Sequence, residues 1–286
     1  MNGEGTMNAG MSTSCFFGRE KLEDTIDIMA KLGVRRAEIF LNTLSEYEPE
    51  FCKELRKRTD DCGIEVLSVH PMGVQFEMQM YTPYERTVND ARDIFLRVLD
   101  ACNFLGAKRY IYHGGLNLKR KKQPVPMSRV AQVTGECARL AGEHGIEFAY
   151  ENVHWCWFDR PQFATELLSR CKEGNLCFNL DIKQAAQSGY PYEQYIKTMG
   201  SRLKSVHLCD HIIDPEGWVK PVAPFTGNTD FELLKQNLVA AGYDGPAILE
   251  LYSGNYRDYD ELGRIFAGIA EIFDDEGDKA NSADNF

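Results

Sequence analysis

The chain has 286 residues, of which 43% are hydrophobic and 26% are charged, and its formal net charge is -11 at pH 7. This composition is typical of a globular protein, and no apolar run comes near the roughly 18 residues that a membrane-spanning helix needs. Because a surplus of carboxylates repels a phosphate backbone, nucleic acid is an unfavourable partner. The basic run from Lys119 to Lys122 is a local exception, which we interpret as a solvated loop or, alternatively, as a contact for a phosphate group or an acidic neighbour.

The nine cysteines are scattered along the chain without a C-x-x-C pair. Small secreted domains use paired cysteines as a disulfide framework, but a chain of this size does not need one. We therefore expect reduced, mostly buried thiols. Because no charged-then-apolar leader is present, we also expect a cytoplasmic location.

Seven glycines separate a segment with helical periodicity from a short apolar segment: Gly33, Gly63, Gly106, Gly145, Gly174, Gly200 and Gly242. A helix commonly ends on a left-handed residue just past its last turn, and glycine adopts that backbone without a Cβ penalty. Ahead of Gly33, for example, Leu22, Ile26 and Met29 recur at helical spacing. The pattern predicts that each glycine ends a helix and leads into a strand.

The apolar runs after these glycines are typical of parallel strands that are covered by helices on the outside. With 14–17 as the first strand, the predicted strands are 14–17, 37–41, 65–69, 109–112, 146–150, 176–180, 205–208 and 247–251. Eight strands in strict alternation with helices favour an α/β fold, a single-domain (β/α)₈ TIM barrel, while a doubly wound open sheet is the alternative. We expect the barrel over 12–273, a flexible N-terminal segment at 1–11 and a flexible acidic tail at 274–286.

Ionisable side chains stand at or just after the ends of six consecutive predicted strands: His70, His113, Glu151, Asp181, His207 and Glu250. The C-terminal ends of barrel strands open into one shared mouth, so these side chains are expected to meet there. Each one alone is equally well explained as a helix cap or a hydrogen-bonded core histidine. Together, three carboxylates and one imidazole form a credible ligand set, because a divalent cation offsets the cost of burying several carboxylates. These four are Glu151, Asp181, His207 and Glu250.

Oxygen-rich ligation with a single histidine favours one divalent metal ion, Mn²⁺ first and Mg²⁺, Co²⁺ or Zn²⁺ as alternatives, over a closed thiolate zinc site. Cys209 lies two residues after His207 and would face the same side of an extended strand. We interpret Cys209 as a packing residue.

The sequence around these residues resembles the xylose isomerase-like barrel superfamily of sugar phosphate isomerases and epimerases, which includes D-tagatose 3-epimerase-like enzymes, inosose dehydratases and endonuclease IV. The resemblance covers nearly the whole chain. The segments that carry it are 150–152 (Tyr-Glu-Asn), 179–181 (Asn-Leu-Asp), 206–210 (Val-His-Leu-Cys-Asp), 226–231 (Thr-Gly-Asn-Thr-Asp-Phe) and 248–251 (Ile-Leu-Glu-Leu). Each is weak alone, but their order and spacing are fairly specific.

The resemblance implies that the four predicted ligands hold the metal, with Glu151 and Glu250 as catalytic acid and base on opposite sides of the substrate. A metal on the carbonyl and a neighbouring hydroxyl acidifies the C–H bond between them and stabilises an enediolate, while a carboxylate removes the proton. Return of the proton from the other face gives epimerisation, and return to the adjacent carbon gives isomerisation.

Two positions depart from the family pattern. Epimerases of this family carry a histidine three residues after the strand-six aspartate, where this chain has Gln184. Endonuclease IV uses that histidine and an Asp-x-His pair to complete a three-metal cluster, whereas Asp210 and His211 are adjacent here. The incomplete cluster and the acidic charge disfavour a DNA repair enzyme.

Further polar and aromatic residues of the predicted mouth are candidates for substrate contact. The predicted substrate-binding residues are His70, His113, Gln184, Trp155, Trp157 and Asp210. Aromatic faces suit the C–H surfaces of a sugar, although the tryptophans, including Trp218, can instead anchor loops or a subunit contact. The loop 72–84, rich in Met, Phe and Tyr, is a candidate lid or oligomer surface, and we expect a homodimer or, as the alternative, a higher homo-oligomer.

The predicted function is a metal-dependent isomerase or epimerase that acts on a ketose or a related sugar. A lyase is the first alternative, because the same enolate can expel a β-substituent from a keto-sugar or an inosose, or cleave a glycoside. The second alternative is a non-catalytic sugar-binding or accessory protein, which the glutamine at 184 motivates.

Overall fold

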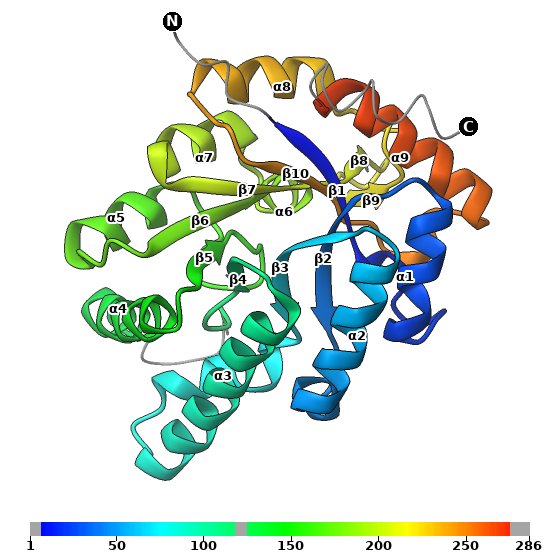
Figure 1. Ribbon diagram of the computed structural model, residues 1–286. Coiled ribbons are helices and arrows are strands. Elements are labelled where there is room, and N and C mark those ends of the chain that lie inside the picture. Colours follow the sequence, from blue (N-terminus) through cyan, green and yellow to red (C-terminus); the bar gives the residue numbers. More distant parts are fainter. Residues whose placement is uncertain (1–6, 118–124, 275–286) are drawn as a thin grey trace, which may run out of the picture.

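The computed structural model describes residues 7–117 and 125–274, and within them eight parallel strands close into a barrel (Figure 1). The strands follow one another around the barrel in the order β1-β10-β7-β6-β5-β4-β3-β2. Their bounds are β1 Asn8–Ser12, β2 Arg36–Leu41, β3 Glu65–Pro71, β4 Arg109–Tyr112, β5 Glu147–Glu151, β6 Leu176–Asp181, β7 Leu203–Leu208 and β10 Pro246–Leu249. The prediction of a single-domain (β/α)₈ TIM barrel is confirmed.

Helices surround the barrel on its outside (Figure 1). In the described residues they are α1 Leu22–Lys31, α2 Pro49–Asp61, α3 Glu85–Leu105, α4 Met127–Glu143, α5 Gln162–Arg170, α6 Ile182–Gln187, α7 Tyr192–Met199, α8 Phe231–Ala240 and α9 Tyr259–Phe273. Short 3₁₀ turns precede or follow several of them: η1 Thr13–Phe16, η2 Leu44–Tyr47, η3 Gly73–Gln75, η4 Glu77–Tyr81, η5 Gly200–Arg202 and η6 Ser253–Asn255. None of these helices is long and apolar enough to cross a membrane.

Helix α3 illustrates how the sequence pattern produces this arrangement. Phe95, Val98, Leu99 and Cys102 recur at helical spacing, and all four are fully buried against the barrel. Gly106 ends the helix in the left-handed conformation, with φ of 74°, as its position predicted. Among the seven predicted helix-ending glycines, Gly174 has no positive φ, because α5 ends earlier in extended backbone at Cys171.

The prediction for the start of the barrel is wrong. The first strand is β1 at Asn8–Ser12, which ends before the predicted strand 14–17 begins. Residues Thr13–Phe16 form the 3₁₀ turn η1 instead of a strand. Residues 8–11 are therefore part of the barrel and not of a flexible segment, since β1 pairs with both β10 and β2. At the other end, the Asp274 carboxylate accepts a 2.7 Å hydrogen bond from the Ala9 amide. Residues 1–6, 275–286 and the basic run Lys119 to Lys122 lie outside the described residues.

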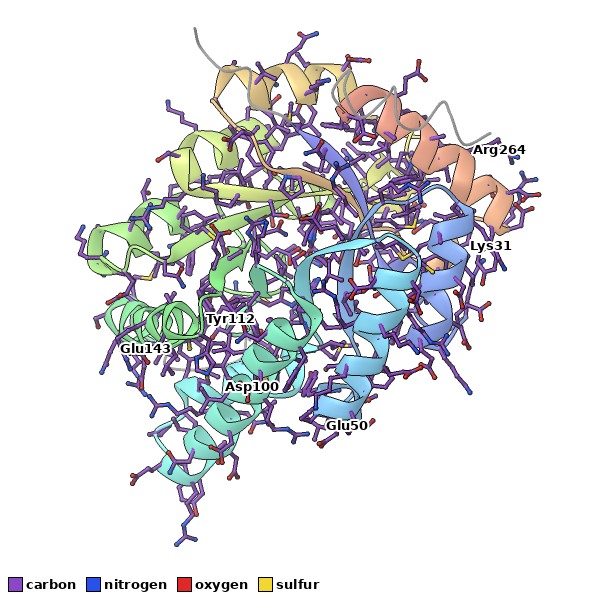
Figure 2. All side chains as sticks on the ribbon, viewed as in Figure 1. Lys31, Glu50, Asp100, Tyr112, Glu143 and Arg264 are labelled. Atoms are coloured by element: carbon purple, nitrogen blue, oxygen red, sulfur yellow. The ribbon has the colours of Figure 1, made fainter. Side chains whose placement is uncertain are left out.

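Charged side chains cover the outer helices, while large apolar and aromatic side chains fill the interior. Figure 2 shows this division with Lys31, Glu50, Asp100, Glu143 and Arg264 on outer helices and Tyr112 inside. A two-stranded antiparallel hairpin, β8 (Asp210–Ile213) and β9 (Val219–Val222), follows β7 and is separate from the barrel sheet. The loops after the barrel strands, including this hairpin, frame the C-terminal mouth where the ionisable side chains gather.

Candidate metal centre

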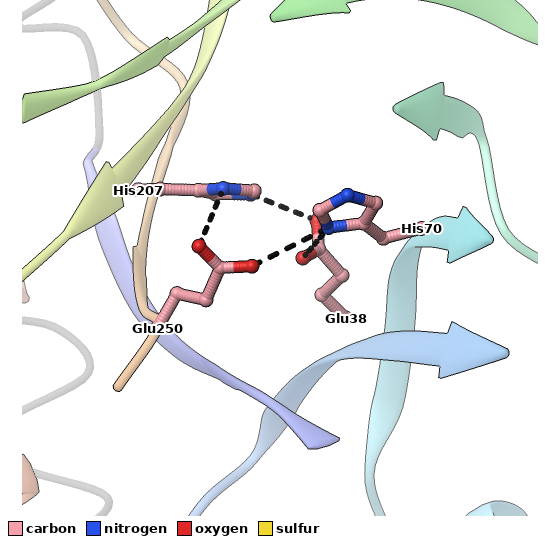
Figure 3. Close-up of side chains that lie close together, drawn as sticks. All are labelled: Glu38, His70, His207 and Glu250. Atoms are coloured by element: carbon pink, nitrogen blue, oxygen red, sulfur yellow. Dashed lines mark hydrogen bonds and ion pairs between the residues drawn. The ribbon is translucent and has the colours of Figure 1, made fainter. Parts of the chain in front are cut away.

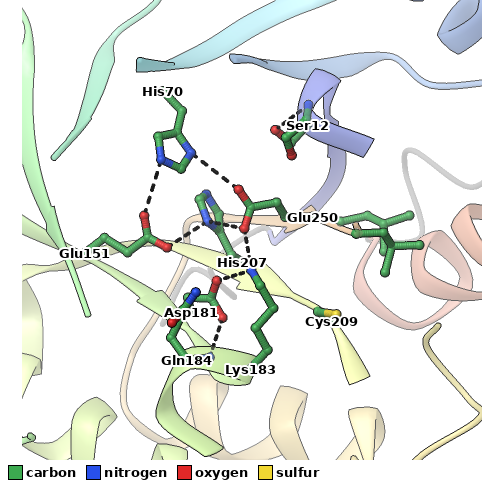
Figure 4. A network of polar contacts seen from close by, with 12 residues as sticks. Ser12, His70, Glu151, Asp181, Lys183, Gln184, His207, Cys209 and Glu250 are labelled. Carbon is green, nitrogen blue, oxygen red and sulfur yellow. Dashed lines mark hydrogen bonds and ion pairs between the residues drawn. The ribbon is translucent and has the colours of Figure 1, made fainter. Parts of the chain in front are cut away.

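The four predicted ligands come together at the barrel mouth (Figure 4). Each offers one ligand atom, and these atoms all lie within 4.8 Å of one another. The four residues are Glu151 at the end of β5, Asp181 at the end of β6, His207 in β7 and Glu250 just after β10. All are buried, and Glu250 is the most exposed of them at 9%. Neighbouring strands of one barrel therefore supply a compact group that can hold a metal ion.

His207 stands at the middle of this group and is oriented by a carboxylate that the sequence analysis missed. Glu38, the third residue of β2, is fully buried, and its Oε2 lies 3.1 Å from His207 Nε2 (Figure 3). Burial would raise the pKa of Glu38, but attraction to His207 and hydrogen bonds from His207 and His70 lower it to about 2. An ionised carboxylate only accepts hydrogen bonds, so Nε2 of His207 carries the proton and Nδ1 faces the ligand group.

The Nδ1 atom of His207 lies between two glutamates. It is 3.3 Å from Glu151 Oε1 and 3.4 Å from Glu250 Oε2. Burial alone would lower the pKa of His207, but Glu38, Glu250 and Glu151 together raise it well above its ordinary value. The cluster thus attracts positive charge to Nδ1, which is the physical requirement of a cation site.

A pair of histidines borders the group on the side of β3 and β4. His70 Nε2 lies 2.8 Å from His113 Nε2, and the same nitrogen of His113 lies 3.0 Å from Glu151 Oε2. On its other edge, His70 Nδ1 is 3.4 Å from both Glu38 Oε1 and Glu250 Oε1 (Figure 3). Burial opposes protonation of His70, yet hydrogen bonds to Glu250 and Glu38 raise its pKa to about 10. The pair therefore links both glutamates to one hydrogen-bonded network.

Asp181 is fixed by backbone and side-chain contacts before any ligand is considered. Asn152 donates to the Asp181 carbonyl and accepts from its amide, both at 2.8 Å, which locks the ends of β5 and β6 together. Asp181 Oδ1 caps α6 by accepting from the Gln184 amide at 2.9 Å. Its Oδ2 accepts from Nζ of Lys183 at 2.5 Å, and the same ammonium donates to Glu250 Oε2 at 2.7 Å. Lys183 is the second residue of this centre that the sequence analysis missed.

A cavity of about 240 Å³ opens above this group and reaches two of its four members, Glu151 and Glu250. Its floor is polar and includes His70, His113, Glu151, Lys183, Gln184 and Glu250. Its walls are apolar and aromatic and include Phe17, Phe40, Trp155, Leu251 and Tyr252. A cavity with a few convergent polar groups on one side and apolar walls on the other is the usual form of a small-molecule site.

The donor set suits a divalent cation in kind and in burial. Three carboxylates and one imidazole match the oxygen-rich ligation of Mn²⁺ or Mg²⁺, and such buried carboxylates need a positive partner. Nδ1 of His207 is a buried atom without a hydrogen-bond partner in the described part of the chain, and it faces the carboxylates of Glu151 and Glu250. Burial, with the nearby Glu151 and Glu250, raises the pKa of Asp181 to about 6 although Lys183 opposes this. Among the three carboxylates, Asp181 is therefore the one whose negative charge the protein compensates least.

The residues predicted to contact substrate fall into two groups. His70, His113, Gln184 and Trp155 line the cavity, although the Gln184 Oε1 atom already accepts hydrogen bonds from the amide and Nδ1 of His154. Trp155 is exposed at the mouth, and its ring centroid lies 5.7 Å from that of His113. The other two predicted residues, Trp157 and Asp210, do not line it.

Trp157 and Asp210 hold the surrounding loops. The Trp157 ring contacts Tyr81, with centroids 4.6 Å apart. Asp210 is fully buried and accepts hydrogen bonds from three backbone amides of its own loop and of the entry to α8: His211, Gly227 and Thr229. A side chain on Gly227 would collide with Asp210 and with the His211 carbonyl, so the close approach requires glycine. These two residues shape the mouth from behind.

Two other predictions concern residues near the mouth. The Cys209 thiol is buried and donates to the carbonyls of Asp210 and Val222, so it packs away from the ligand group. The loop 72–84 contains η3 and η4, and its Phe76 and Met80 are buried. Within it, the buried Glu77 accepts from the amides of His113 and Gly114 and from the Tyr110 hydroxyl. Glu77, a third missed residue, thus fixes the backbone that presents His113.

The sequence matches the family described as the xylose isomerase-like TIM barrel over residues 19–272. The chain belongs to this family. The family relation agrees with the closed barrel and with the residues on which the sequence resemblance rested. It leaves the substrate open.

Named relatives of this family member are epimerases and a dehydratase. The chain is 23% identical over 246 residues to a 3-dehydroshikimate dehydratase of Pseudomonas aeruginosa, a match that covers 82% of this chain and 37% of that protein. The chain therefore spans well under half the length of this relative.

Solved structures with the same fold include two epimerases. A D-psicose 3-epimerase from Clostridium cellulolyticum, crystallised with D-tagatose, has a TM-score of 0.77 at 17% identity and covers 94% of this chain and 100% of its own. A 3-keto-D-glucoside 4-epimerase from E. coli has a TM-score of 0.70 at 15% identity and covers 93% of this chain and 98% of its own. At these identities the likeness establishes the fold alone.

Proposed function

We propose that this protein is a divalent-metal-dependent enzyme that moves a proton at a carbon next to a carbonyl group, as an isomerase or epimerase of a ketose or related sugar. The observation that carries this proposal is the convergence of Glu151, Asp181, His207 and Glu250 at the base of a cavity with apolar walls, which Glu151 and Glu250 line directly. A cation held by these residues, Mn²⁺ in the first place, would polarise the carbonyl and acidify the adjacent C–H bond.

Glu151 and Glu250 are the groups proposed to take up and return the proton. Burial would raise the pKa of both, but attraction to His207 and His113 lowers that of Glu151, and attraction to Lys183 and His207 lowers that of Glu250. Both are therefore carboxylates that can accept a proton. β6 and β7 lie between β5 and β10 in the barrel, and in this proposal the two glutamates act on opposite sides of the substrate. Removal on one side and return on the other inverts the carbon centre.

The remaining cavity residues suit a polyhydroxylated substrate. The histidine pair His70 and His113 offers ring nitrogens to substrate hydroxyl groups, with Gln184 beside them. Trp155, Phe17 and Tyr252 present aromatic surface that suits the C–H face of a sugar ring. We do not assign Trp157 or Asp210 to the substrate, since their contacts hold loops.

Substitution of Glu250 by glutamine tests the proposed chemistry. A panel of ketoses is first screened with the wild type in the presence of Mn²⁺ to find one that it converts. Glutamine keeps the size of the side chain but cannot accept the proton, so turnover of that ketose by the variant should fall by about 10²–10⁴-fold. Exchange of the substrate carbon-bound hydrogen with solvent deuterium, followed by NMR, measures the proton step itself. Glu54→Gln, on the exposed side of α2, is the matched control and should leave turnover unchanged. Full activity of Glu250→Gln would refute the role of this residue.

A dehydratase is the second candidate, because the curated relative of this chain is named as one. The same proton removal next to a carbonyl would then be followed by loss of a β-hydroxyl group as water. Mass spectrometry of the product separates the two reactions, since isomerisation conserves the mass of the substrate and dehydration lowers it by one water. Metal binding without exchange or turnover over a broad panel of keto-sugars would instead support a non-catalytic binding protein.

A further inference from the structure

Lys183 turns from the first turn of α6 into the barrel mouth, where it contacts two of the four proposed ligands. Its side chain is only 3% exposed, and Nζ lies 2.5 Å from Asp181 Oδ2 and 2.7 Å from Glu250 Oε2 (Figure 4). A lysine side chain normally reaches solvent, because burying an ammonium group is costly unless it is paired. The position of Lys183 therefore requires a reason within the site.

The surroundings of Lys183 hold it as a permanent cation. Its ammonium is enclosed by the carboxylates of Asp181 and Glu250, both within hydrogen-bonding distance, and such pairing offsets the cost of burying the charge. The ring of Tyr252 faces the ammonium, with 5.5 Å from Nζ to the ring centroid. The pairing with two carboxylates suits an ammonium group, which places a fixed positive charge beside the proposed ligands.

The ammonium and a divalent metal need the same oxygen atoms. Asp181 Oδ1 is already bound to the Gln184 amide, so Oδ2, the oxygen that Lys183 holds, is the one free to face a metal. Glu250 Oε2, the second oxygen that Lys183 holds, is also the one that faces His207 Nδ1. A metal ion binds carboxylate oxygens at roughly 2.0–2.2 Å, and a positive charge on the same two oxygens opposes its binding.

We propose that Lys183 is a built-in cation of this centre that competes with the divalent metal for Asp181 and Glu250 and so weakens metal binding. This inference rests on the proposed metal dependence. In the metal-free protein Lys183 keeps the two carboxylates together, and in the loaded protein its charge or its displacement is a cost to the metal. The site is thus a weak, exchangeable metal site and not a permanently loaded one.

Mn²⁺ affinity in a lysine variant tests the competition. Titration of the full chain with Mn²⁺, followed by the EPR signal of free Mn²⁺, gives the dissociation constants of the wild type, Lys183→Met and Lys183→Gln. The inference predicts at least tenfold tighter binding in both variants. Lys108→Met is the matched control. Lys108 is 79% exposed and directly precedes β4, at the end of the barrel opposite the mouth, so the Mn²⁺ affinity of this variant should equal that of the wild type.

Melting temperature provides a second readout that a purely structural lysine would not produce. Without metal, Lys183→Met and Lys183→Gln should melt below the wild type, because Asp181 and Glu250 lose their partner. Saturating Mn²⁺ should raise the melting temperature of the variants more than that of the wild type, since ligand binding stabilises in proportion to its affinity. Two variants of different polarity guard against one that fails to fold.

The outcomes separate this inference from the proposed function. Equal or weaker Mn²⁺ binding in the variants overturns the competition, whatever the activity of the wild type. Mn²⁺ binding by the variants but not by the wild type supports the competition and refutes a metal-dependent reaction in the native protein. An absence of binding in all of them overturns both.

Discussion

Replacement of Glu38 by glutamine removes one negative charge from the contact between β2 and His207 without changing the size of the side chain. Glu38 Oε2 is 3.1 Å from His207 Nε2 and 2.8 Å from Ser68 Oγ, and Oε1 is 3.4 Å from His70 Nδ1. Its pKa is lowered from the ordinary 4.5 to about 2, which corresponds to roughly 3–4 kcal/mol at about 1.4 kcal/mol per pKa unit. We expect the variant to lose a stabilisation of this order at pH 7.

The pH dependence follows from the direction of the change. A carboxylate whose pKa is lower in the folded protein stabilises the fold above its unfolded pKa, and this stabilisation disappears as pH falls through the folded value. The difference in unfolding free energy between wild type and Glu38→Gln should therefore be constant from pH 7 to about 5 and shrink as pH falls from about 4.5 toward 2.

Urea denaturation in EDTA at pH 7, 5, 4 and 3, followed by tryptophan fluorescence, measures this difference without metal. Glu50→Gln is the matched control, because its side chain is 89% exposed, and it should leave the unfolding free energy unchanged at every pH. A difference for Glu38→Gln that is near zero, or that stays constant down to pH 3, would show that the charge of Glu38 does not hold the imidazoles of His70 and His207.

Two further predictions concern residues around the barrel. All nine cysteines are free, and only Cys62 is partly exposed. A thiol reagent should therefore label one cysteine rapidly in the native protein and all nine after denaturation, as measured by mass spectrometry. Fast labelling of several thiols in the native protein would contradict the buried positions. Trp155→Ala should raise KM several-fold with little effect on melting temperature, because Trp155 lines the cavity. Trp157→Ala should lower the melting temperature, because the Trp157 ring packs against Tyr81. The reverse pattern in kinetics and thermal melts would assign substrate contact to Trp157 and loop packing to Trp155.

Most of the fold follows from local sequence signals, but the first strand does not. Seven of the eight strands are predictable, because each is an apolar run that follows a helix-ending residue. β1 has the sequence Asn-Ala-Gly-Met-Ser, which resembles a polar tail. The glycine in β1 is required by contacts that only the folded structure reveals. A side chain on Gly10 would meet Ile248 Cδ1 at 2.6 Å and the Arg36 carbonyl at 3.0 Å, so contacts with β10 and β2 require glycine there.

In the candidate site, the sequence predicts which residues stand at the strand ends but not the direction in which every side chain points. The four ligands are predictable because each stands at the end of a strand, where the barrel brings strand ends together. Glu38 could have been found as the one charged residue within the predicted strand 37–41. Lys183 could not, because a lysine in the first turn of a helix gives no sign that it points inward. Its direction is set by Asp181 and Glu250, which lie 2 and 67 positions away in the sequence.

An anomalous difference map from crystals soaked in Mn²⁺ tests the metal centre most directly. We predict one peak at the barrel mouth, bound at roughly 2.0–2.2 Å by one oxygen each of Glu151, Asp181 and Glu250 and by Nδ1 of His207, with Lys183 withdrawn from at least one of its two carboxylates. A map without such a peak, in which Lys183 still bridges Asp181 and Glu250, would contradict the proposal that this barrel works with a divalent metal.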